Sequence, residues 1–249
     1  MTSLFSHFLL QHLYVVVQPI VHSKTREVHF FEILSRVKYG NEIHMPNDFI
    51  PEMSIDMRYK LAKYLFHYIG DLQEQYPEIS FSINLSSLEI DMGIEAYLSE
   101  LLRSNECNID SSRCIIEITE HSSINDETTY ESIKNIKEKF GFRFALDDFG
   151  SKYATLNKVY SDQEVFDYIK VDGSLIQGIV NNPMKQLNFI MMIDFIQKNN
   201  KKAIVEYISS NEIYQKVMEL AHPDYLQGYL FGKPVSIQDF LTCNEKKGA

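Results

Sequence analysis

Short runs of apolar, often β-branched residues alternate along the chain with longer segments of helical periodicity. The short runs predict eight strands, over 14–20, 27–36, 79–85, 113–119, 142–148, 167–171, 202–207 and 225–229. Apolar residues recur at helical spacing from Met57 to Tyr76, and Asn182 ahead of Pro183 is a favourable start for another helix. The segment 123–126 resembles a capping box and predicts a helix over 126–140.

Eight strands that alternate with helices over 249 residues are typical of an α/β protein built as a TIM barrel. One connection departs from the regular barrel, because only the six residues Val21–Arg26 separate the first two strands. A parallel crossover needs a dozen residues or more. We therefore expect a modified (β/α)8 TIM-like barrel with one antiparallel strand, in a single domain over 1–249 with its core at about 14–240. An open doubly wound sheet fits the same alternation and is the alternative.

Composition and charge exclude several classes of protein. Hydrophobic residues make up 45% and charged residues 23%, as in ordinary globular proteins. The chain has 24 Lys+Arg against 34 Asp+Glu, a net charge of −10, which argues against polymeric nucleic acid as a partner. The three cysteines lack CxxC spacing, which suggests reduced thiols in a cytoplasmic protein.

The apolar N-terminus does not have the pattern of a targeting or membrane segment. It contains no Lys or Arg before Lys24, and polar residues interrupt it. No stretch of the chain reaches the roughly 18 uninterrupted apolar residues that a membrane helix needs. We expect the N-terminus to form a docking helix ahead of the first strand.

Polar side chains stand near the ends of the predicted strands. Such a residue alone is more often a helix cap or a solvated loop residue. In a barrel, however, the C-terminal strand ends converge on one mouth, and the set as a whole predicts a functional site. Its members are Glu32, Arg36, Asn84, Glu117, Asp147, Asp148, Lys170, Glu206 and Gln227.

The chemistry of this set favours a hard divalent cation. Five carboxylates and the Asn84 amide are oxygen ligands suited to Mg²⁺ or Mn²⁺. The adjacent Asp147 and Asp148 suit a binuclear site, since one can bridge while the other serves the second ion. Two such ions can activate water and stabilise an in-line phosphoryl displacement. The eight histidines show no zinc-binding spacing.

An ordered set of motifs then points to one family. The chain carries Gln18-Pro19-Ile20-Val21, Glu32-Ile33-Leu34-Ser35-Arg36, the 45–51 segment MPNDFIP, Ile83-Asn84-Leu85-Ser86, Glu117-Ile118-Thr119-Glu120, Asp147-Asp148-Phe149-Gly150, Ile169-Lys170-Val171-Asp172 and the 227–234 segment QGYLFGKP. From about Tyr14 to Val235 it resembles the EAL-domain phosphodiesterases of bacterial cyclic di-GMP signalling. The implied reaction is hydrolysis of cyclic di-GMP to linear pGpG with Mg²⁺ or Mn²⁺, two ions in all, and the implied assembly is a homodimer.

The resemblance also implies a role for each motif residue. Glu32, Asn84, Glu117 and Asp147 would hold the first metal, and Asp147 and Asp148 the second. Lys170 would orient the attacking water, Glu206 would position metal or water, and Gln227 would support the metal shell. Gln18 and Arg36 would contact the substrate, since a guanidinium can neutralise a phosphate oxygen. Glu120 would anchor the loop after Asp148.

The chain departs from the family pattern in three places. Ser151-Lys152-Tyr153 replaces the usual Thr-Gly-Tyr, and two extra residues lie between Asp148 and Lys170. The Ala-Glu-Gly-Val-Glu motif becomes Val205-Glu206-Tyr207-Ile208-Ser209, which keeps the first Glu and loses the second. Two alternatives to catalysis on cyclic di-GMP therefore stay open. One is a non-catalytic protein that binds the nucleotide or a protein partner, and the other is a barrel phosphodiesterase with a different substrate.

Overall fold

The computed structural model describes residues 11–104, 108–119, 127–150 and 165–245. Its strands are β1 (Leu13–His22), β2 (Val28–Tyr39), β3 (Glu42–His44), β4 (Phe81–Leu85), β5 (Cys114–Thr119), β6 (Arg143–Phe149), β7 (Tyr168–Val171), β8 (Lys202–Val205) and β9 (Tyr225–Gln227). Its α-helices are α2 (Pro46–Phe49), α3 (Ile55–Gln75), α4 (Ser87–Asp91), α5 (Ile94–Ser104), α6 (Glu127–Phe140), α8 (Pro183–Lys198), α9 (Asn211–Leu220) and α10 (Ile237–Glu245). Short 3-10 turns lie at Ser111–Arg113, Gly173–Leu175 and Ile179–Asn181.

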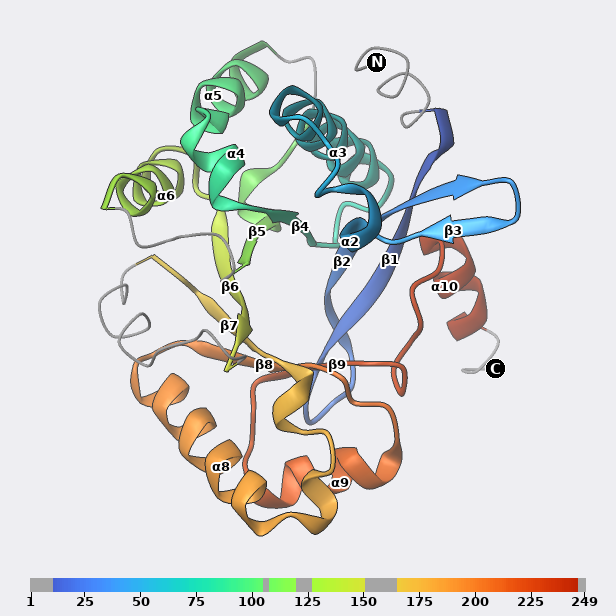
Figure 1. The fold of residues 1–249 in the computed structure, drawn as a ribbon, viewed down its shortest axis with the longest axis vertical. Helices are drawn as coiled ribbons and strands as arrows, with labels where there is room; N and C mark the ends of the chain where they lie inside the picture. Colours follow the sequence, from blue (N-terminus) through green and yellow to red (C-terminus); the bar gives the residue numbers. More distant parts are fainter. Residues whose placement is uncertain (1–10, 105–107, 120–126, 151–164, 246–249) are drawn as a thin grey trace.

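The strands close into a barrel. Hydrogen bonds link them in the order β1-β9-β8-β7-β6-β5-β4-β2, and β1 also pairs with β2 to close the ring. Figure 1 shows the helices outside this ring, while the β2–β3 hairpin projects from it. The closed ring confirms the barrel expectation and excludes the open doubly wound sheet.

β1 is the reversed strand. It runs antiparallel to β2 on one side and to β9 on the other. From β2 through β4 to β9, the remaining neighbours in the ring pair in parallel. The antiparallel pairing of β1 with β2 confirms the expectation from their short connection, which is long enough for a hairpin but too short for a parallel crossover.

Each of the eight predicted strands is present, with small shifts at its ends. β8 ends at Val205, two residues before the predicted end, so Glu206 directly follows the strand. The edge strand β3 was not predicted, because three residues give too short an alternation to be recognised.

The long predicted helices also form. α3 covers 55–75 and α6 begins at 127, each within two residues of expectation. Pro183 is the first residue of α8, after Asn182. The predicted docking helix at the N-terminus and the capping-box residues 123–126 lie largely outside the described residues. Among the described residues, no helix has both the length and the apolar character needed to cross a bilayer.

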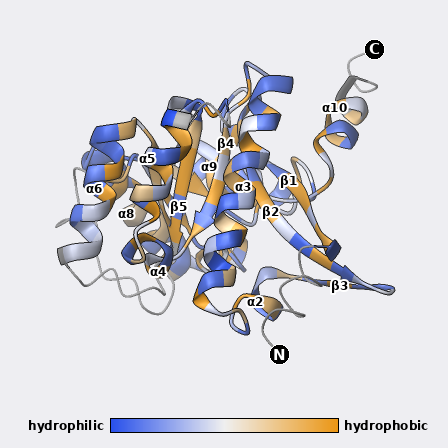
Figure 2. Ribbon diagram, turned by 90° about the horizontal axis from the view of Figure 1, so that it is seen from above, coloured by the Kyte–Doolittle hydropathy of each residue, from blue (hydrophilic) through white to orange (hydrophobic). Residues whose placement is uncertain are grey.

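The apolar core has two parts. Phe31, Ile116 and Leu146 represent the larger part, which lies between the outer face of the strands and the helices. A smaller cluster fills one end of the barrel interior and consists of Ile20, Phe30, Ile115, Ala145, Tyr168, Ile204 and Tyr225. Figure 2 shows the apolar strands, among them β5, surrounded by helices of mixed polarity. The smaller interior cluster fills one end of the barrel, so polar side chains that point into the barrel must lie at the other end.

Candidate active site

The two-residue period of the strands places one layer of polar side chains directly above the apolar layer. In β5, Ile115 belongs to the interior cluster and Glu117 is the next residue on the same face. The same step of two residues leads from Tyr168 to Lys170 and from Ile204 to Glu206. Because β1 runs in reverse, its step leads backward, from Ile20 to Gln18. Residues that are distant in sequence therefore meet in one polar layer at the same end of the barrel.

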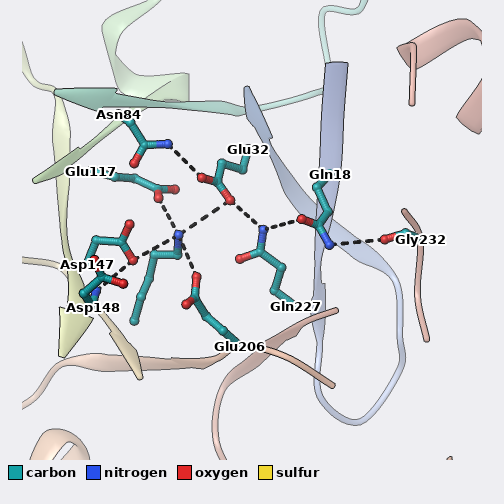
Figure 3. A network of polar contacts seen from close by, with 10 residues as sticks. Gln18, Glu32, Asn84, Glu117, Asp147, Asp148, Glu206, Gln227 and Gly232 are labelled. Carbon is teal, nitrogen blue, oxygen red and sulfur yellow. Dashed lines mark hydrogen bonds and ion pairs between the residues drawn. The ribbon is translucent and has the colours of Figure 1, made fainter. Parts of the chain in front are cut away.

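The Lys170 ammonium contacts four carboxylates of this polar layer. Figure 3 shows Glu32, Glu117, Asp147 and Glu206 pointing towards one another from different strand ends. The Nζ of Lys170 is 2.6 Å from Glu117 Oε2, 2.9 Å from Glu206 Oε1, 3.2 Å from Asp147 Oδ1 and 3.6 Å from Glu32 Oε2. The side chains of Lys170 and Glu117 are almost completely buried, with exposed fractions of 1% and 0%. Buried charges need such pairing, because unpaired ones are strongly disfavoured away from water.

Two amides hold Glu32 from the other side. Asn84 donates from Nδ2 to Glu32 Oε1 at 2.7 Å, and Gln227 donates from Nε2 to Glu32 Oε2 at 2.6 Å. Gln18 lies directly opposite Glu32 in the β1–β2 register. Gln18 accepts from Gln227 at 3.5 Å and donates to the Gly232 carbonyl at 3.3 Å. This chain of hydrogen bonds fixes the orientation of the Glu32 carboxylate.

The end of β6 brings two consecutive aspartates to the same mouth. In a regular strand, neighbouring side chains point to opposite faces. Asp148, however, has a left-handed backbone with φ 57°, and the β6–β7 register shifts between Leu146 and Phe149. The Asp148 amide donates to Asp147 Oδ1 at 2.9 Å. As a result, carboxylate oxygens of Asp147, Asp148 and Glu206 lie within 4.8 Å of one another.

Burial and crowding change the acidity of the cluster. Burial is the main cause that raises the pKa of Glu117 to about 8, and neighbouring Glu32 and Asp147 raise it further. Burial likewise raises the pKa of Glu206 to about 8. For Glu32, burial is outweighed by the Lys170 charge and the two amide hydrogen bonds, so its pKa is lowered. Burial opposes the charge on Lys170, but the surrounding carboxylates hold its pKa well above the usual value.

The residues present fit a divalent cation. Glu117 Oε1 is buried and has no hydrogen-bond partner among the described residues, as expected of an oxygen that serves an ion. The carboxylates outnumber the one described ammonium that contacts them, and cations such as Mg²⁺, Mn²⁺ and Ca²⁺ prefer carboxylate and amide oxygens. The site is therefore capable of holding a hard cation.

A cavity lies on either side of the carboxylate cluster. The first has a volume of about 350 Å³ and extends from Asn84, Asp147 and Asp148 towards α2 and α3. The second has a volume of about 290 Å³, and its lining consists of Gln18, Glu32, Leu34, Glu206, Tyr207, Ser209, Gln227, Gly228 and Tyr229. Tyr207 and Tyr229 were not predicted as lining residues, since an exposed tyrosine after a strand has no distinctive spacing.

One described residue that was singled out in the sequence, Arg36, stands apart from the network. Arg36 lies on β2 but is partly buried, and its Nη1 donates to the Ser35 carbonyl at 2.8 Å. It lies near Tyr14, Glu32 and Tyr229, and burial lowers its pKa despite their influence. Glu120 lies outside the described residues, as do Ser151 and Lys152.

Comparisons with known proteins agree with the motifs and the fold. A family model described as the EAL domain matches residues 3–234. The chain is 28% identical over 240 residues to the cyclic di-GMP phosphodiesterase PdeF of Escherichia coli strain K12, a match that covers 93% of this chain and 31% of PdeF. The chain thus spans about a third of the length of that curated relative.

Solved structures support the same architecture. The EAL enzyme Bd1971, in its cAMP and cyclic-di-GMP bound form, superposes with a TM-score of 0.82 at 22% identity, over 96% of this chain and 66% of that chain. Klebsiella pneumoniae BlrP1, as a manganese/cy-diGMP complex at pH 9.0, gives a TM-score of 0.75 at 22% identity, over 90% of this chain and 56% of that chain. Because the family model matches nearly the whole length and the barrel is shared, this chain belongs to the EAL domain family.

Proposed function

We propose that the protein hydrolyses cyclic di-GMP to linear pGpG in a reaction that depends on divalent metal. The observation that carries this proposal is one polar layer with a cavity on either side. Four carboxylates surround Lys170 in this layer, Asp148 lies beside them, and two amides bind Glu32. A cyclic dinucleotide has two bases flanking its phosphates, so one phosphodiester can lie over the carboxylates while a base enters each cavity. The curated relative PdeF, named a cyclic di-GMP phosphodiesterase, supports the same substrate.

The metal ligands would be Glu32, Asn84, Glu117, Asp147 and Asp148, and we propose two ions, Mg²⁺ or Mn²⁺. Bound there, they would lower the pKa of a coordinated water and neutralise charge on the phosphate. The oxygen of Glu117 that lacks a described partner supports this assignment, as does the close approach of Asp147 and Asp148. The manganese complex of BlrP1, a protein of the same fold, is consistent with the choice of ion.

The side chains of this protein would orient the reaction. Lys170 is held protonated by the carboxylates around it, so it would orient the attacking water and stabilise negative charge, and it would not accept a proton. Glu206, 2.9 Å from Lys170, would help to position the water. The water oxygen bonds to phosphorus while the bond from phosphorus to the ribose 3′ oxygen breaks. One proton ends on that leaving oxygen.

Gln18 and Arg36 would bind the substrate. Gln18 lines the second cavity. Arg36 lies on the same strand as Glu32 and near Tyr229 at the edge of that cavity. Its guanidinium would move from the Ser35 carbonyl to a phosphate oxygen, where a charge-assisted and bidentate hydrogen bond is available.

A receptor that binds cyclic di-GMP without hydrolysing it is the second candidate. Two observations favour it. Ser209 occupies the place of the second Glu of the motif, and the Lys170 ammonium lies among the carboxylates that would hold metal. The retained set of carboxylates favours the enzyme, because like charges in one buried layer are costly unless a cation uses them.

Product analysis separates the two candidates. The purified protein is incubated with cyclic di-GMP and Mg²⁺ or Mn²⁺, and pGpG is followed by chromatography. We expect pGpG with metal and none after chelation. Glu32→Ala should abolish turnover, whereas Glu42→Ala on the exposed hairpin serves as the matched control. Nucleotide binding without product in either metal would refute the enzyme and leave the receptor. A fully active Glu32→Ala variant would contradict the ligand assignment.

We further propose a homodimer formed through α8, in a cytoplasmic protein. The helix exposes large apolar side chains at helical spacing, with Met184 exposed by 64%, Leu187 by 51% and Met191 by 61%. Such a stripe is typical of a surface that a second protein covers. The homodimer implied by the family resemblance makes a second copy of this chain the proposed occupant.

A further inference from the structure

Tyr207 directly follows Glu206 and occupies the position of the Gly in the family motif Ala-Glu-Gly-Val-Glu. Its backbone has φ 65°, in the left-handed region that glycine adopts freely and that a bulky residue adopts rarely. Its side chain is 58% exposed and lines the second cavity. An aromatic residue with a strained backbone thus lies beside Glu206, the proposed positioning residue for the water.

The fold accommodates this tyrosine through Gly173. A Cβ added at Gly173 would lie 2.5 Å from Tyr207 Cβ and 2.8 Å from its Cγ, so only glycine leaves room there. The stem of Tyr207 is therefore held against the backbone of the turn Gly173–Leu175, while the ring extends to the cavity. The two positions fit each other, and the strain at Tyr207 is not relieved by burial of the ring. Strained backbone that lacks a packing reason is characteristic of functional sites.

We propose that Tyr207 binds the substrate by stacking its ring on one guanine base in the second cavity, an inference that rests on the proposed function. Stacking on an aromatic ring is a general way in which proteins hold an unpaired base. The cavity of about 290 Å³ has room for a purine. Tyr207 thereby determines specificity for a purine on this side of the cleaved phosphate, and it acts as a binding and positioning residue.

A polar group in the same cavity complements the stacked base. Gln227 is 4% exposed and lines the cavity, and its Oε1 has no hydrogen-bond partner among the described residues. This oxygen is an acceptor for a donor of the guanosine, either a base N–H or the ribose hydroxyl. The side chain of Ser209, which lines the same cavity, offers a hydroxyl that both donates and accepts. A flat apolar face with a few polar groups at its edge is the usual composition of a base site.

The first test measures binding. Affinity for cyclic di-GMP is measured by calorimetry with Ca²⁺ in place of Mg²⁺, for the intact chain and for Tyr207→Gly and Tyr207→Phe. We expect Tyr207→Gly to weaken binding about 5- to 160-fold, the range of one lost stacking contact. Tyr207→Phe should bind within about 2-fold of the original chain, because stacking does not need the hydroxyl. Since glycine relieves the left-handed strain, Tyr207→Gly should melt no lower than the original chain, which separates lost stacking from misfolding.

The second test observes stacking directly. The chain contains no tryptophan, so Tyr207→Trp places a single tryptophan in the cavity, and its emission can be excited selectively over that of the remaining tyrosines. Cyclic di-GMP should quench this emission in a saturable way, with the Kd found by calorimetry. Tyr64→Trp, at a partly exposed position on α3, is the matched control and should show no quenching.

The outcomes distinguish this inference from the proposed function. Normal binding by Tyr207→Gly together with unquenched Tyr207→Trp would overturn the stacking role and leave the proposed function intact. An original chain that neither binds nor hydrolyses cyclic di-GMP would overturn both. Weaker binding by Tyr207→Gly with a raised KM and an unaltered response to Mg²⁺ would support a role in base binding rather than in metal binding.

Discussion

At the scale of single residues, the positions of the site follow from strand alternation. The polar residue two steps beyond each interior apolar residue was readable in the sequence, as with Ile115 and Glu117. The left-handed turns at Asp148 and Tyr207 were not readable, because neither residue is the glycine that normally announces such a conformation. The orientation of Arg36 towards the Ser35 carbonyl was also beyond the sequence, since alternation fixes the face of a side chain and not its rotamer.

Lys170 leads to the first prediction at this scale. Lys170→Met keeps most of the side-chain volume but leaves buried carboxylates without their ammonium. Removing one partner of a buried charge cluster should lower the free energy of unfolding by about 3 kcal/mol without metal. Added Mn²⁺ should raise the melting temperature of Lys170→Met more than that of the original chain, because the ion restores positive charge.

Lys202→Met is the control for this experiment. The Lys202 side chain is 58% exposed and its Nζ lies 2.8 Å from Asp224 Oδ1, so the loss of this ion pair should cost no more than about 1 kcal/mol. Scanning calorimetry at pH 8, with chelator and then with metal, measures both variants. Equal losses from the two substitutions, or no rescue by metal, would contradict the central role given to Lys170.

At the scale of elements, local signals were sufficient where caps and periodicity were strong. Asn182 and Pro183 marked the start of α8 at the correct residue. The edge strand β3 escaped recognition because its three residues pair only with β2, and that pairing depends on the turn after Tyr39. The end of β8 was also difficult to place from the sequence. The Glu206 amide still donates to the Val171 carbonyl, although the strand itself ends at Val205.

The cap of α8 gives a second prediction. The Asn182 side chain accepts from the backbone amides of Met184 at 3.1 Å and Lys185 at 3.2 Å. Asn182→Ala leaves these amides without their cap and should cost about 1 kcal/mol, which lowers the melting temperature by about 2–4 °C. Asn181→Ala, at the neighbouring exposed position, is the control and should change the melting temperature by less than about 1 °C. An unchanged Asn182→Ala would show that solvent caps the helix as well as the side chain does.

At the scale of the whole molecule, the sequence suggested the class of fold and left its closure open. Periodicity is the same for strands of an open and of a closed sheet. Closure depends on pairs such as Ile20 with Gln227, which lie at opposite ends of the chain and have no local signal. The family motifs resolved this ambiguity in advance, because most of them fall at strand ends that meet in a closed barrel.

The closed end of the barrel gives a third prediction, on pH. His29 stacks on Tyr225 with ring centroids 4.2 Å apart and lies 3.1 Å from the Tyr168 hydroxyl. Burial, and then the charges of His22, Arg143 and Lys202, lower its pKa from 6.5 to about 4. Between pH 6.5 and 4, the unfolded chain therefore binds a proton at His29 that the folded chain does not bind. The folded state loses stability as the pH falls through this window.

The free energy of unfolding should fall by about 2 kcal/mol across this window. This is less than the full pKa difference would give, because the ring is only partly buried and solvent screens its charge. Melting temperatures measured from pH 7 to pH 4 should fall less steeply for His29→Phe than for the original chain. His44→Phe on the exposed hairpin should keep the original slope. The same slope in all three proteins would refute the assignment of this titration to His29.

The proposed dimer gives a fourth prediction at this scale. Replacing two residues of the α8 stripe, as Leu187→Glu with Met191→Glu, places charge on the apolar surface and should convert a dimer to a monomer. Light scattering coupled to gel filtration measures the change. Ile43→Glu, at an equally exposed apolar position on β3, should leave the dimer intact. A monomeric original chain, or a dimer that survives the α8 substitutions, would exclude this interface.

The reversed strand β1 also has a consequence for synthesis on the ribosome. Its first partner, β2, emerges directly after it, but its other partner, β9, belongs to the last part of the described chain. At about 5–20 residues per second, the nascent chain waits roughly 10–40 s with one edge of β1 unpaired. Pro19, which lacks an amide proton, interrupts the row of donors along that edge and makes it a poorer template for another nascent chain. The same proline lies against Gly232 once the ring has closed.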